Sequence, residues 1–139
     1  MKLIFIVLFV LVTQQSYANG RIVVVVSDQS GIESLDNQQV ANIFLARTKI
    51  FPNGNHAIPV ELNDNNIRSL FYQGISGKTP SQLNAYWTTL VFTGKGKPPK
   101  RISDNEKLYN QLIENPDTIG YIFENQIHDK KLKVVYRFP

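Results

Sequence analysis

The chain has 139 residues, with fifteen basic and eleven acidic side chains, a net charge of +4 and no cysteine. This length can bury the modest core of one domain. Without cysteine the domain has no disulfides, so packing alone must hold it together, and a cysteine-linked lipoprotein is excluded. The excess of basic side chains favours an anionic ligand or an anionic surface.

Residues 1–18 are typical of a secretory signal peptide. Lys2 precedes an apolar run from Leu3 to Val12, and Ser16-Tyr17-Ala18 fits a cleavage site. The run is short for a bilayer span, which disfavours a retained anchor. We therefore expect a periplasmic protein with a single domain over residues 19–139, no transmembrane segment after cleavage and no nucleic-acid partner.

The first half of the expected domain alternates between strand and helix patterns. Ile22–Val26 is an unbroken β-branched run, typical of a strand that is covered on both faces. Asp36 and Gln39 can form a capping box for a helix. Residues 57–62 alternate as a second strand, and the polar residues 63–66 can cap the next helix. The buried stripes expected for these two helices are Val40, Ile43 and Phe44, and then Ile67, Leu70 and Phe71.

The third predicted helix has the clearest boundary signals. Thr79 and Gln82 can form a capping box around Pro80, and Gly94 supplies the left-handed residue that ends the helix. We expect Trp87 to be its largest core side chain. The apolar stripe predicted for this helix is Leu83, Tyr86, Trp87, Leu90 and Val91.

The rest of the chain predicts one more helix and two strands. Ser103 and Glu106 can form a capping box for a helix that ends before Pro116. Ile119–Phe123 is typical of a short strand, and Leu132–Phe138 of an edge strand. The order of strand, helix, strand, three helices and two strands predicts an α/β three-layer sandwich with a mixed sheet.

Several segments resemble one known family. Leu35–Phe44 and Asn115–Tyr121 are similar to segments of the phosphate-binding proteins of ABC transporters. Over Ile22 to Val135 the chain resembles the short, single-lobe phosphate transporter substrate-binding-like proteins, which implies one lobe of a type 2 periplasmic-binding fold. The segments that carry this closer resemblance are Phe71-Tyr72, Gly77-Lys78, Gln82–Trp87, Val91–Gly96 and Pro98-Pro99.

The resemblance also implies a kind of ligand. The family binds its oxyanion between two lobes, and this chain is long enough for the second lobe only. In that lobe the family places an arginine and a Ser-Gly-Thr where a strand leads into a helix. The matching positions, Leu62–Ile67, contain no Ser-Gly-Thr, and Arg68 is the nearest cation. Phosphate or another small oxyanion is the implied ligand, and a second copy of the chain could rebuild a cleft.

The predicted anion site is the start of the helix that follows Asn63. Free backbone N–H groups and the helix dipole favour an anion there. Asp64 could occupy the same donors, so plain helix capping is the alternative. Ser27 ends the first strand, where open α/β sheets bind ligands, although a simple turn also explains it. The expected ligand-binding residues are Asn63, Asn65, Asn66, Arg68 and Ser27.

A densely basic loop follows Gly94. It places Lys95, Lys97, Lys100 and Arg101 within seven positions, between glycines and prolines. Such a run can be solubilising only. As a functional feature it suggests an adaptor that contacts an envelope protein through this loop, with ligand binding lost.

No pattern predicts catalysis or a metal. His56 and His128 are isolated, and Gly74–Thr79 is two residues short of a phosphate loop and follows a helix. No Ser/His/Asp order or paired-carboxylate motif is present. We therefore expect a non-enzymatic protein without metal or other cofactor that binds a small anion weakly.

Overall fold

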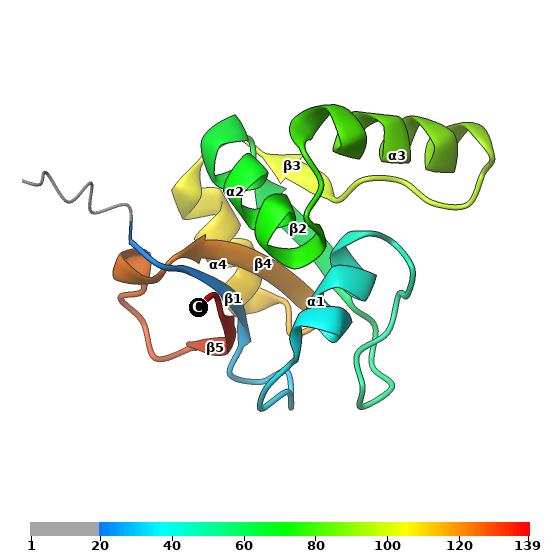
Figure 1. Ribbon diagram of the computed structural model, residues 1–139. Coiled ribbons are helices and arrows are strands. Elements are labelled where there is room, and N and C mark those ends of the chain that lie inside the picture. The colour runs from blue at the N-terminus through cyan, green and yellow to red at the C-terminus, as the bar shows by residue number, and fades with distance from the viewer. Residues whose placement is uncertain (1–19) are drawn as a thin grey trace, which may run out of the picture.

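The computed structural model describes residues 20–139, and the predicted signal peptide lies outside them. The described chain forms strands and helices that alternate along the sequence (Figure 1). The elements are β1 (Ile22–Ser27), α1 (Asn37–Phe44), β2 (Ile58–Leu62), α2 (Asn65–Ser76), α3 (Pro80–Phe92), β3 (Lys100–Ile102), α4 (Asn105–Glu114), β4 (Thr118–Phe123), the 3-10 turn η1 (Glu124–Gln126) and β5 (Leu132–Arg137).

The strands form one mixed sheet in the order β3-β2-β4-β1-β5. β2 runs parallel to β3 and β4, whereas β1 is antiparallel to β4 and β5. Helices cover both faces of the sheet, with α4 on one side and α1 and α2 on the other (Figure 1). The predicted α/β three-layer sandwich with a mixed sheet is therefore confirmed, and β5 is an edge strand as expected.

β1 shows why an unbroken apolar run was required. Val24 and Val26 point into the core beneath α1 and α2, and Val23 and Val25 into the core beneath α4. All four side chains are fully buried. A strand covered on both faces directs the side chains of both faces into a core, which explains the absence of alternation.

Two boundaries differ from the sequence prediction. Residues 100–102 were expected to belong to a loop, but they form β3, paired in parallel with Val60–Leu62. The capping box predicted for Ser103 and Glu106 is wrong, because Asp104 caps α4 by accepting from the Lys107 N–H at 2.8 Å. A three-residue edge strand is specified by its neighbour rather than by its own pattern, so its sequence carried no signal.

Two residues predicted to be buried are exposed. Leu70 on α2 is 52% exposed and Val91 on α3 is 54% exposed. α3 lies at the periphery of the molecule and buries only Leu83 and Trp87, so its apolar stripe is wider than the surface it covers (Figure 1). The expectation for Trp87 is confirmed, since it is only 5% exposed.

Replacing Thr79 with alanine is expected to lower the free energy of unfolding by about 1 kcal/mol. The Thr79 hydroxyl accepts from the Gln82 N–H at 3.3 Å, and the Gln82 side chain accepts from the Thr79 N–H at 3.0 Å. Urea unfolding measures the change. Thr79→Ser keeps the hydroxyl and should retain most of the stability; equal losses in both variants would contradict a capping role.

Candidate functional site

Glu61 on β2 is the central residue of the candidate site. Its neighbour Val60 points toward α4, so the strand's alternation directs Glu61 to the face beneath α1 and α2. That face is covered, and the Glu61 side chain is fully buried. A buried carboxylate is strongly destabilising unless cations and hydrogen-bond donors compensate for its lost hydration.

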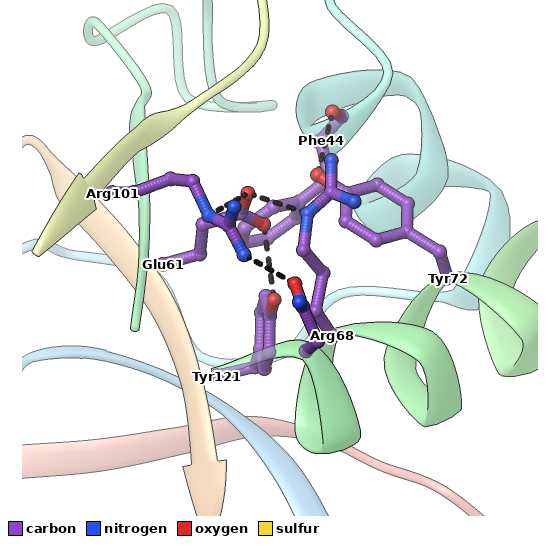
Figure 2. Close-up of polar contacts among 7 residues, drawn as sticks. Phe44, Glu61, Arg68, Tyr72, Arg101 and Tyr121 are labelled. Carbon is purple, nitrogen blue, oxygen red and sulfur yellow. Dashed lines mark hydrogen bonds and ion pairs between the residues drawn. The ribbon is translucent and has the colours of Figure 1, made fainter. Parts of the chain in front are cut away.

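Three side chains supply that compensation (Figure 2). The Arg68 Nε of α2 donates to Glu61 Oε1 at 3.0 Å, and the Tyr121 hydroxyl of β4 donates to Glu61 Oε2 at 2.9 Å. The Arg101 Nε of β3 lies 3.9 Å from Glu61 Oε1. Two guanidinium groups therefore share one buried carboxylate, which leaves one positive charge unbalanced within this group.

Burial and the Glu61 charge keep two tyrosines protonated. Burial is the main cause that raises the pKa of Tyr121 well above its usual range, and the negative charge of Glu61 raises it further. The same two causes, in the same order, raise the pKa of Tyr72. The Arg68 guanidinium carbon lies over the Tyr72 ring, 5.2 Å from the ring centroid. The Tyr72 hydroxyl donates to the Phe44 carbonyl. Both phenols are hydrogen-bond donors here rather than bases.

The start of α2 lies beside this cluster. Asp64 caps the helix by accepting from the Asn66 N–H at 2.8 Å, which is the capping considered as the alternative. The Arg101 Nη2 donates to Asn65 Oδ1 at 2.9 Å, and the Asn63 N–H donates to the Ile102 carbonyl. Of the predicted residues, the structure thus brings Asn65 and Arg68 to Arg101 and Glu61, and Asp64 takes one of the helix donors.

Ser27 is not part of this group. It is buried at the end of β1, where its hydroxyl accepts from the Gln29 N–H at 3.1 Å. β1 is antiparallel to β4, and β4 is parallel to β2. The C-terminal end of β1, with Ser27, therefore points in the opposite direction from the C-terminal end of β2, which Asn63 follows. The structure therefore does not unite the five residues expected to bind ligand.

The basic loop divides into two parts. The Arg101 side chain lies on the same face of the sheet as Glu61 and contacts it. Lys95, Lys97 and Lys100 are exposed to solvent. Pro99 is buried, which fixes the loop against the body of the protein. The sequence grouped Arg101 with the lysines as a partner contact, and the structure instead places it in the Glu61 cluster.

Sequence reasoning missed Glu61 and Tyr121. The sequence predicted an alternating strand over residues 57–62 and gave Glu61 no role. The available signal was that β2 had to be covered on both faces in a three-layer sandwich, so neither face could leave a carboxylate in water. Tyr121 lies 60 positions away along the chain, and only the pairing of β2 with β4 brings it near.

Within residues 20–139 no three acidic or histidine side chains come together as a metal site. In the same range, no helix combines the length and apolarity that a membrane crossing requires. The arrangement at Glu61 can attract and hydrogen-bond an anion, and its side chains include no activated nucleophile.

Comparison with solved structures identifies the class of fold. The chain is similar to a phosphate ABC transporter substrate-binding protein with bound phosphate from Clostridium perfringens, with 16% identity and a TM-score of 0.64 over 84% of this chain and 44% of that one. It is also similar to an ABC-type phosphate transport receptor from Vibrio cholerae, with 12% identity and a TM-score of 0.55 over 84% and 45% of the two chains.

A possible phosphate-binding protein from Planctomyces limnophilus gives a TM-score of 0.59 at 15% identity, over 84% of this chain and 40% of that one. The chain thus spans less than half the length of these proteins and matches one lobe of their fold. The resemblance to phosphate transporter substrate-binding proteins is confirmed at the level of the fold. No family model and no curated sequence matches the chain.

Proposed function

We propose that this protein is a non-catalytic binding lobe that takes a small oxyanion such as phosphate, weakly, at the corner between β2, β3 and α2. The observation that carries this proposal is the convergence of Arg68 and Arg101 on a single buried carboxylate, Glu61. The unbalanced positive charge lies beside the N-terminus of α2, whose dipole also favours an anion. The phosphate bound in the similar protein from Clostridium perfringens supports this choice of ligand.

The same contacts explain why binding would be weak. Glu61 engages Arg68 most closely, and Asp64 takes one N–H at the helix start, so an incoming anion competes with two internal carboxylates. Arg101 is the more accessible cation, with 37% of its side chain exposed. Export to the periplasm, expected from residues 1–18, is the setting in which such a lobe would meet its ligand.

Titrating the purified protein with phosphate and sulfate is expected to give a dissociation constant in the millimolar range by calorimetry. At 100 times that constant, thermal unfolding should report about 2.7 kcal/mol of added stability. Arg101→Gln should weaken binding at least about tenfold, because a charge-assisted hydrogen bond contributes about 1.5–3 kcal/mol.

Lys107→Gln is the matched control, because Lys107 is an exposed cation of α4 whose ion pair is with Asp104. It should leave the anion affinity unchanged. No detectable binding of either anion, or equal affinity in Arg101→Gln and wild type, would reject the proposed site.

A second candidate function is an interaction module that contacts an envelope partner through the basic loop, with ligand binding lost. The observation that favours it is the internal neutralisation of Arg68 by Glu61 and of the helix start by Asp64. The lysines of the loop keep no such partner within the ion pairs of residues 20–139. A silent anion titration together with capture that depends on Lys95 and Lys97 would favour this function.

A further inference from the structure

The charge of the chain is strongly uneven along its length. Residues 65–103 contain six basic side chains and no acidic one, while the remainder contains nine basic and eleven acidic side chains. The basic segment therefore accounts for more than the whole net charge of +4. It includes α2, α3, the loop after α3 and β3, which form one end of the molecule in Figure 1.

Exposed apolar side chains lie within the same basic segment, at the C-terminal end of α3. Phe92, the last residue of α3, is 91% exposed, and Val91 beside it is 54% exposed. In Figure 1 the C-terminal end of α3 points away from the sheet and lies at the edge of the molecule. An aromatic side chain so fully exposed is unfavourable in water and favourable at an apolar or interfacial surface.

The backbone holds the lysines next to this aromatic tip. Gly94 adopts a left-handed conformation, φ 68°, which reverses the chain directly after α3, and the Lys95 N–H donates to the Leu90 carbonyl at 2.9 Å. Gly96 then passes so close to Ala46 that a Cβ there would lie 3.2 Å from the alanine methyl. Lys95 and Lys97 are therefore displayed on a fixed loop within five positions of Phe92.

We propose that the tip formed by Val91, Phe92, Lys95 and Lys97 docks onto an anionic lipid membrane surface. An aromatic side chain enters the interface between head groups and acyl chains, while lysines beside it attract anionic lipids. The choice of lysine favours lipid over protein, because lysine is depleted in the cores of protein interfaces, where arginine is enriched. The one arginine of the loop, Arg101, is turned toward Glu61 and Asn65 instead.

This inference names the partner for the docking surface of the second candidate function, and it does not require anion binding at Arg101. The protein would lie on the membrane through the tip, while the partly exposed Arg101 of the proposed oxyanion site remains accessible from water. Anion binding and membrane docking are therefore separate properties that separate variants test.

The test is sedimentation of the purified protein with phosphatidylglycerol/phosphatidylcholine vesicles, compared with pure phosphatidylcholine vesicles. We expect binding to the anionic vesicles only, falling as salt increases. Replacing Lys95 and Lys97 together with glutamine should weaken binding about 25-fold, because each lysine near an anionic surface contributes about a factor of five. Phe92→Ser should weaken it about tenfold, and Phe92→Leu should retain binding.

A matched double variant, Lys130 and Lys131 to glutamine, removes the same charge outside the basic segment. It should lose far less affinity than the tip variant. Equal losses in the two double variants, or no binding to anionic vesicles at low salt, would overturn the proposal, and the second result would instead direct attention to an acidic protein partner. Arg101→Gln should bind vesicles normally even where it loses phosphate, which separates this inference from the proposed oxyanion site.

Discussion

Replacing Arg68 with alanine is expected to lower the free energy of unfolding by about 3–5 kcal/mol, because it removes the closest cation from a buried carboxylate. Glu61 is fully buried, and its Oε1 accepts from Arg68 at 3.0 Å, whereas Arg101 lies 3.9 Å away. The remaining donor, Tyr121, supplies a hydrogen bond without a charge. Urea unfolding followed by circular dichroism measures the change.

A double variant separates the ion pair from the packing around it. Glu61→Leu combined with Arg68→Met removes both charges and keeps similar volumes, so it should be more stable than Arg68→Ala alone. A loss below about 1 kcal/mol for Arg68→Ala would show that the pair is not needed, since exposed pairs contribute that little. A double variant less stable than the single one would also contradict this account. The same measurement shows at which temperatures Arg68→Ala is folded well enough for anion titrations.

Replacing Phe71 with alanine is expected to cost about 3–5 kcal/mol, the range for removing a buried aromatic ring. Phe71 is fully buried in α2, and its ring stacks on Tyr121 with centroids 3.7 Å apart. It also meets Phe44 edge-on at 4.8 Å. Its loss would open a cavity directly beneath the Tyr121 hydroxyl that donates to Glu61. Chemical unfolding at several temperatures measures the stability.

Phe92→Ala is the matched control for Phe71→Ala. It deletes the same atoms from a side chain that is 91% exposed, so the free energy of unfolding should change by no more than about 0.5 kcal/mol. Similar losses in the two variants would mean that Phe92 is covered in solution, and a small loss at Phe71 would mean that the aromatic cluster is not the core of this face.

The local features that the sequence predicted are those formed by residues close together in the chain. The capping boxes at Asp36 and Thr79 are present, since each needs only a side chain and a backbone group three positions apart. The unbroken run Ile22–Val26 correctly indicated a strand covered on both faces, because successive side chains of a strand point to opposite faces and all of these are apolar. From such signals the three-layer class of the fold could be predicted.

What the tertiary structure alone decided are the features that join distant residues. β3 exists because β2 offers it a partner, and Glu61 faces the core because helices cover both sides of β2. The pairing of β2 with β3 places Arg101 beside Glu61. Because β1 is antiparallel to β4, Ser27 lies at the opposite end of the strands from this cluster. The periodicity of a sequence shows which residues lie on the same face of a helix or strand. Which other element packs against that face depends on the tertiary structure.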